Sequence, residues 1–172
     1  MKRYNMKKFL VTCAVVALVG NAVLPATASA ASCATQMEKI ALNTRVLQTD
    51  LMVAALTCSQ RSQYNNFVTK FKPVLIKNGK TLQAYFHRVY GGKSANELNV
   101  FITQIANDAS TMSTRSLATE FCASSAALFE KTAKMKEKEL DDLTADERFN
   151  RHGINTCTGE QFASKADKSE SK

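Results

Sequence analysis

The fold is decided by residues 33–58, which read CATQMEKIALNTRVLQTDLMVAALTC. Small or apolar side chains recur along this stretch at alternating spacings of four and three residues: Cys33, Met37, Ile40, Thr44, Leu47, Leu51, Ala54 and Cys58. That period matches one face of an α-helix. The stretch therefore predicts a helix of about 25 residues with a cysteine at each end of its buried face.

The next segment, residues 60–90, shows the same helical period with a strongly aromatic apolar face. Its members are Tyr64, Phe67, Val68, Phe71, Val74, Leu75, Leu82, Tyr85, Phe86 and Val89. Pro73 has no N–H and disfavours helix at Lys72, so we expect a break there. Asn78-Gly79 is a second weak point, and Gly91-Gly92 ends the segment.

Two further amphipathic helices follow. The third opens with the capping box Ser94–Glu97 and carries Leu98, Phe101, Ile102, Ile105, Ala109 and Met112. A Ser/Thr-rich bend at residues 110–116 separates it from the fourth, which carries Leu117, Phe121, Leu128, Phe129, Thr132 and Met135 and frays beyond Lys136. The fold class predicted is all-α, an up-and-down bundle of about four amphipathic helices.

The ends of the chain differ from this helical region. Residues 31–143 are expected to form the bundle domain. Residues 144–172 are expected to hold a short turn, capped by Thr144 and Glu147, followed by a mobile polar tail.

The N-terminus has the three parts of a secretory signal. Lys2, Arg3, Lys7 and Lys8 precede the apolar residues 9–19, and Ala28-Ser29-Ala30 is the best cleavage motif. Ala26-Thr27-Ala28 is the alternative motif, and Met6 is an alternative start. A retained anchor is disfavoured because the apolar core, residues 9–24, is shorter than the roughly 20 residues that span a bilayer. Residues 1–30 are thus expected to be removed, which predicts a periplasmic or secreted protein.

Four cysteines remain after that removal: Cys33, Cys58, Cys122 and Cys157. An even number in an exported chain predicts two disulfides. In an up-and-down bundle Cys58 and Cys122 lie at one end, and Cys33 and Cys157 lie towards the other. Of the three possible pairings we therefore favour Cys58–Cys122 with Cys33–Cys157. No C-x-x-C or C-x-x-C-H occurs, so no metal site and no covalent haem is expected.

The most unusual feature is the charge of residues 60–93. This segment has no acidic residue and seven basic ones: Arg61, Lys70, Lys72, Lys77, Lys80, Arg88 and Lys93. The chain as a whole has 23 basic and 15 acidic residues. We single out Lys70, Lys72, Lys77, Lys80 and Arg88 as a candidate interaction patch for a protein or an anionic envelope component. The competing interpretation is a solvated face whose aromatic side chains form core.

Residues for catalysis are sparse. His87 is the one plausible imidazole base of the helical region, while Asp141-Asp142 and Asp146-Glu147 read as charged helix ends. The sequence has no H-E-x-x-H motif, no P-loop and no G-x-G-x-x-G. We therefore expect no catalytic residues and no cofactor, and export makes nucleic acid an unsuitable partner.

These observations favour a small exported helical protein that acts as a non-catalytic binding or scaffold protein of the cell envelope. The first alternative is a membrane-surface or secreted effector that uses residues 60–93, and the second is an enzyme of unknown class. At Tyr64–Phe67, Tyr85–Arg88 and Leu98–Phe101 the chain resembles small exported helical proteins of Gram-negative bacteria. That resemblance carries over no functional residue.

Overall fold

The computed structural model describes residues 33–115, 117–146, 149–150, 152 and 155–157. The expected signal peptide and the expected C-terminal tail lie outside these residues. The described part contains six α-helices: α1 (Gln36–Thr57), α2 (Arg61–Lys70), α3 (Lys72–Tyr90), α4 (Ser94–Arg115), α5 (Ala118–Lys134) and α6 (Glu139–Thr144). A short 3-10 helix, η2 (Gly91–Lys93), joins α3 to α4. The predicted all-α bundle is confirmed.

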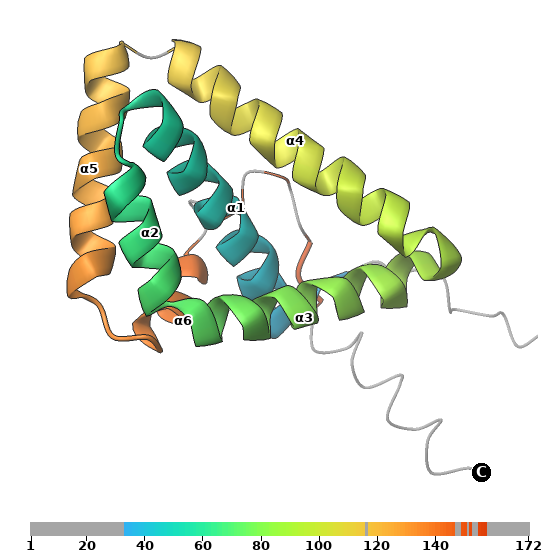
Figure 1. Ribbon diagram of the computed structural model, residues 1–172. Coiled ribbons are helices and arrows are strands. Elements are labelled where there is room, and N and C mark those ends of the chain that lie inside the picture. The colour runs from blue at the N-terminus through green and yellow to red at the C-terminus, as the bar shows by residue number, and fades with distance from the viewer. Residues whose placement is uncertain (1–32, 116, 147–148, 151, 153–154, 158–172) are drawn as a thin grey trace, which may run out of the picture.

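Helix α1 lies at the centre of the molecule. Figure 1 shows α2, α3, α4 and α5 arranged as a frame around it, and α1 contacts each of these helices and α6. A helix enclosed on several sides must be apolar around most of its circumference. Accordingly Leu42, Val46, Leu47 and Leu51 are all at most 1% exposed.

The predicted face of α1 is correct in its C-terminal half and wrong at its start. Leu47, Leu51 and Ala54 are buried, as expected, but Met37 is 62% exposed. The N-terminal half packs against α3 and α4 through Leu42 and Val46, which lie off the predicted stripe. The helical period of the sequence identifies one buried face of α1, whereas the neighbouring helices cover several of its faces.

The first residues of α1 carry a cap that the sequence analysis did not identify. The Thr35 hydroxyl accepts a hydrogen bond from the Glu38 N–H at 3.2 Å, and the Thr35 N–H donates to Glu38 Oε2 at 2.8 Å. This reciprocal pair is a capping box, which satisfies two N–H groups at the start of the helix. The capping box also fixes the position of the Glu38 carboxylate at the N-terminal end of α1.

The aromatic face of residues 60–90 is confirmed, and so is the break. Phe67, Phe71, Tyr85 and Phe86 are buried, and the chain bends at Phe71, between α2 and α3. Pro73 lies in the first turn of α3, where its missing N–H would have had no partner within the helix. The second weak point does not break the helix, because α3 continues through Asn78 and Gly79 to Tyr90.

The turn before α4 follows the glycine signal, but the capping box expected at Ser94 is wrong, because Ser94 is already helical, with φ of −53° and ψ of −41°, and lies inside α4. Gly91, with φ of +55°, ends α3 in a conformation that favours glycine. Helix α4 begins at Ser94 and continues to Arg115, so the bend expected over residues 110–116 does not interrupt it. The hydroxyls of Ser113 and Thr114 donate to the Ser110 carbonyl within the helix. Met112 and Leu117, expected on buried faces, are 43% and 67% exposed, because they lie near the turn between α4 and α5, at the edge of the frame.

Helix α6 was not predicted. It buries Leu140 and Leu143 against α1, and it ends at Thr144 instead of beginning there. The Thr144 hydroxyl donates to the Leu140 carbonyl at 3.0 Å and so bonds back along its own helix. The capping box expected at Thr144 is therefore wrong, since this side chain lies at the C-terminal end of a helix.

Both predicted disulfides are present. The Cα atoms are 5.5 Å apart in Cys58–Cys122 and 5.0 Å apart in Cys33–Cys157, within the roughly 7 Å that a disulfide can bridge. Beside the second, the Ala34 N–H donates to the Asn155 carbonyl and the Cys157 N–H to the Ala34 carbonyl. Both ends of α1 are thus covalently attached to later parts of the chain. Within the described residues, no helix has the length and apolarity needed to cross a membrane.

Candidate functional site

The basic segment at residues 60–93 is divided by the fold into two sets of cations. We call Lys70, Lys77 and Arg88 the inward cations, because each has a partner on another element. We call Arg61, Lys72, Lys80 and Lys93 the outward cations, because all four are exposed and have no such partner among the described residues. The candidate patch named from the sequence therefore contains three inward members and two outward ones.

Arg88 makes the most extensive contacts of the inward set. Its Nε and Nη2 donate to the two carboxylate oxygens of Glu38 at 3.0 and 2.7 Å, and Nη2 also donates to the Cys33 carbonyl at 2.9 Å. Such a two-pronged pair is stronger than a single contact. Burial by itself would raise the pKa of Glu38, but the hydrogen bonds from Arg88 and Thr35 and the charge of Arg88 outweigh it and hold that pKa below its usual value.

The Arg88 guanidinium also lies over the ring of Tyr85, 5.4 Å from its centroid. Burial raises the pKa of the Tyr85 phenol, so this side chain stays neutral at physiological pH. Arg88 thus joins α3 to the start of α1, next to the Cys33–Cys157 disulfide.

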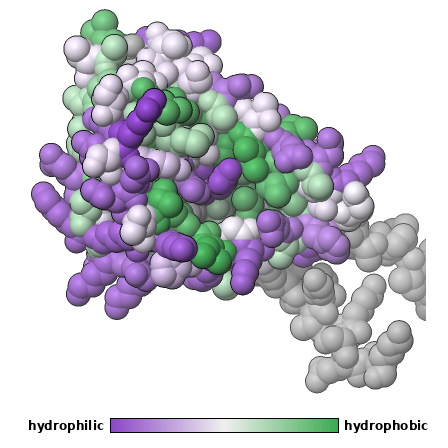
Figure 2. Space-filling model, in the orientation of Figure 1, coloured by the Kyte–Doolittle hydropathy of each residue, from purple (hydrophilic) through white to green (hydrophobic). Residues whose placement is uncertain are grey.

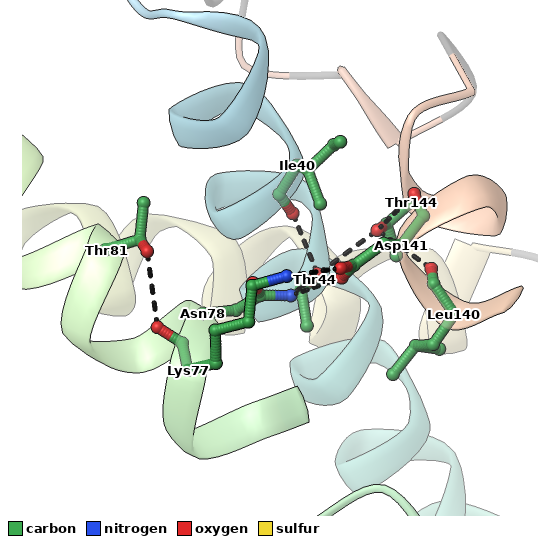
Figure 3. Close-up of polar contacts among 8 residues, drawn as sticks. All are labelled: Ile40, Thr44, Lys77, Asn78, Thr81, Leu140, Asp141 and Thr144. Carbon is green, nitrogen blue, oxygen red and sulfur yellow. Dashed lines mark hydrogen bonds and ion pairs between the residues drawn. The ribbon is translucent and has the colours of Figure 1, made fainter. Parts of the chain in front are cut away.

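Lys77 belongs to a polar network between α1, α3 and α6, shown in Figure 3. Its Nζ contacts Asp141 Oδ2 at 2.7 Å, and the neighbouring Asn78 donates to Asp141 Oδ1 at 2.9 Å. Asn78 also donates to the Thr44 hydroxyl at 3.0 Å, which in turn lies 3.1 Å from the Thr144 hydroxyl. Because Asn78, Thr44 and Thr144 are buried, these bonds hold α6 in place between α1 and α3.

Lys70 contacts the C-terminal end of α5. Its Nζ donates to the carbonyls of Ala133 and Thr132, and it lies 5.5 Å from the centroid of the Phe71 ring. The last carbonyls of a helix have no partner within it and carry partial negative charge, so a lysine is favourable there. Lys70 is therefore a structural contact between α2 and α5.

The outward cations have no such partners. Within the described part of the chain, Arg61, Lys72, Lys80 and Lys93 form no ion pair and no side-chain hydrogen bond. Lys72 and Lys80 lie on the outer side of α3 with Ile76 one turn from each, and Ile76 is 51% exposed. Figure 2 shows a mainly hydrophilic surface along α2 and the outer edge of α3.

The candidate catalytic groups are not brought together. His87 is exposed in an open depression between α3 and α4, which Lys80 and Ser94 also line. His152 Nε2 lies 3.7 Å from Asp108 Oδ2, and its ring stands edge-on to Phe101. Asp141 contacts Lys77 and Asn78, whereas Asp142 is exposed. Over the described residues, no group of three or more His, Cys, Asp and Glu side chains could hold a metal ion.

Two hollows on the surface are more enclosed than the depression beside His87. One, of about 480 Å³, lies between α2 and α5 over Phe67, Phe71 and Phe129. The other, of about 230 Å³, lies between α1, α3 and α4 and includes Arg45 and Gln48 of α1. The sequence analysis did not identify either. For the second, the available signal was Arg45, a cation near the middle of α1.

Comparison with models of protein families, with curated proteins and with solved structures finds no match to this chain.

Proposed function

We propose that this protein is a non-catalytic binding or scaffold protein of the cell envelope, and that the outward cations contact an anionic component of that envelope. The observation that carries the proposal is the division of the basic segment. The inward cations are held by Glu38, by Asp141 and by helix carbonyls, whereas Arg61, Lys72, Lys80 and Lys93 are exposed without partners in the described part of the chain.

The disulfides support an extracytoplasmic location. Two cystines attach both ends of α1 to the rest of the fold, and such bonds persist mainly in oxidising compartments. With the signal-like residues 1–30, they support export to the periplasm or beyond. A rigid, covalently closed frame is also suited to presenting fixed charges to a partner.

A membrane-surface role is the second candidate, and one observation favours it. Ile76 is half exposed and lies between Lys72 and Lys80 on the same side of α3. Cations that flank an exposed apolar side chain match the boundary between lipid headgroups and acyl chains. Each cation near an anionic lipid surface contributes about 1 kcal/mol.

The experiment compares the unaltered protein with a variant in which all four outward cations are replaced by Gln: Arg61→Gln, Lys72→Gln, Lys80→Gln and Lys93→Gln. The probes are phosphatidylglycerol vesicles, phosphatidylcholine vesicles and polyglutamate. We expect the unaltered protein to bind at least one anionic probe, more weakly as salt rises. The variant should lose roughly two orders of magnitude or more in affinity, at about 1 kcal/mol for each cation.

The matched control removes four exposed lysines of α5 and of the turn that follows it: Lys131→Gln, Lys134→Gln, Lys136→Gln and Lys138→Gln. Its net charge equals that of the first variant, so equal losses in both would show that only total charge matters and would overturn the proposal. Binding to vesicles but not to polyglutamate supports the membrane-surface role, and the reverse supports an acidic protein partner. Equal binding of the quadruple variant and the unaltered protein would leave the outward cations as a solvated face.

A further inference from the structure

The hollow between α1, α3 and α4 is built from one face of each helix. Helix α1 contributes Ala41, Thr44, Arg45 and Gln48, whose spacing of three and four residues places them on one side. Helix α3 contributes Leu75, Leu82 and Gln83 among others, and α4 contributes Leu98 and Ile102. Figure 2 shows hydrophobic surface in the area bounded by these helices. A mainly apolar concave surface with a few polar groups is the usual composition of a small-molecule site.

Arg45 is the unusual member of this lining. It is half-buried on the central helix, and its guanidinium has a single hydrogen-bond partner among the described residues, Gln48 Oε1 at 3.3 Å. Its Nε is fully buried and has no hydrogen-bond partner. A buried donor without an acceptor is costly, so native structures rarely retain one without a reason.

The contrast with Arg88 shows what Arg45 lacks. Arg88 has a comparable place between helices, and both oxygens of Glu38 complete its hydrogen bonds. No carboxylate in the described part of the chain takes that role for Arg45. The planar guanidinium is therefore left with donors that match a carboxylate from outside the chain.

Gly79 provides an independent observation on the opposite wall. It lies inside α3, where glycine is a poor helix former, and its φ is not positive. A Cβ built at Gly79 would meet nothing within 4 Å, so no neighbour requires a glycine there. Gly79 lines the same hollow as Arg45, and a side chain at this position would meet open space.

We infer that this hollow is a binding site for a small carboxylate with a short apolar body. The carboxylate pairs with the guanidinium of Arg45, and the body lies against Leu75, Leu82 and Ile102. At about 230 Å³ the hollow is smaller than the 300–1,000 Å³ typical of drug-sized ligands, which favours a short chain. This inference is independent of the outward cations.

The test uses hexanoate as the probe, with 1-hexanol and hexylammonium as the neutral and cationic analogues of the same body. Binding is followed by NMR through the Arg45 Nε–H resonance and the backbone amides of residues 75–83. We expect hexanoate to shift these signals in a saturable way and to bind at least tenfold more tightly than 1-hexanol. Hexylammonium should bind more weakly still, because it places a cation beside Arg45.

Two variants locate the site. Arg45→Gln removes the charged fork and should lower hexanoate affinity at least tenfold, whereas Lys131→Gln removes the same charge from an exposed position on α5 and should leave it unchanged. Gly79→Leu fills the hollow and should abolish binding. Gly79→Ala should raise the melting temperature, because alanine is the better helix former and meets no clash. That rise would show that substitution at Gly79 does not unfold the protein.

The inference is overturned if hexanoate fails to bind, or if it binds the Arg45→Gln variant as tightly as the unaltered protein. It is equally overturned if 1-hexanol binds as well as hexanoate, or if the shifted amides lie outside the three helices that line the hollow. Melting curves of each variant separate a lost site from a lost fold.

Discussion

The inward and outward cations come from one stretch of sequence and have opposite roles. Arg88 and Lys80 are both basic residues on α3, yet the Arg88 side chain is 28% exposed and bound to Glu38, while Lys80 is exposed and unpaired within the described residues. What separates them is the side of the helix on which each lies. The charge of a sequence segment therefore does not give the charge of the surface that it forms, because other elements supply partners for some of its charges.

Those complementary charges come from distant parts of the chain. Glu38 lies on α1, Asp141 lies on α6, and the carbonyls that bind Lys70 end α5. A segment with no acid of its own can therefore be partly neutralised by the fold. We expect the two sets of cations to differ in their contribution to stability as they differ in geometry.

The largest difference is expected between Arg88→Gln and Lys80→Gln. Loss of Arg88 leaves the Glu38 carboxylate, only 12% exposed, without its charge partner and frees the Cys33 carbonyl. We expect a loss of about 2–3 kcal/mol in the free energy of unfolding. Lys80→Gln should change it by less than about 0.5 kcal/mol. Urea unfolding with intact disulfides measures both, and similar values for the two variants would remove the distinction.

The next effect concerns Asn78, a neutral inward residue of the same helix. Asn78→Ala removes the donor to Thr44 and Asp141 and leaves a small cavity in the network that holds α6. We expect a cost of about 2 kcal/mol. Amide hydrogen exchange should also rise in α6 more than in α4. Unchanged exchange in α6 would mean that Leu140 and Leu143 hold this helix without the network.

The Glu38–Arg88 pair predicts a dependence of stability on pH. The pKa of Glu38 is lowered in the folded state, so the stability that it contributes is present above its unfolded pKa, near 4.5, and is lost as pH falls through the folded value. In Glu38→Gln that contribution is missing at every pH. The difference in unfolding free energy between this variant and the unaltered protein should therefore be constant at neutral pH and shrink below about pH 4.5. A difference that stays constant down to pH 3 or so would contradict the assignment.

The smallest effect is expected for Lys77→Gln. The Lys77 side chain is 57% exposed, so its ion pair with Asp141 is screened by solvent despite the short distance. We expect a loss of about 0.5 kcal/mol, which should disappear at about 1 M salt, where the screening length is about 3 Å. Lys72→Gln is the matched control and should show no loss at either salt concentration. A loss of stability as large as that of Arg88→Gln would contradict the prediction that solvent screens the Lys77–Asp141 ion pair.

Much of the fold followed from local patterns. The aromatic period of residues 60–90 predicted which side chains of α2 and α3 are buried, and Pro73 predicted the bend at Phe71. The order of Cys33, Cys58 and Cys122 along the helices, with Cys157 after the bundle, favoured the pairing that the structure has. These features could be predicted because each depends on helical period, chain direction or a single backbone constraint.

Other features depend on which helices meet. Met37 has the correct period but lies where no helix covers it, and α6 is too short for its period to be recognised. The candidate site is less predictable still. The sequence by itself determined that residues 60–93 carry seven cations and no acid, that the chain is helical and that its cysteines pair. Only the tertiary structure decided which cations face Glu38, Asp141 and the end of α5. It also decided that Arg45 lines a hollow that has no carboxylate in its lining. The reason is that charges pair through space, between elements that are far apart in the chain.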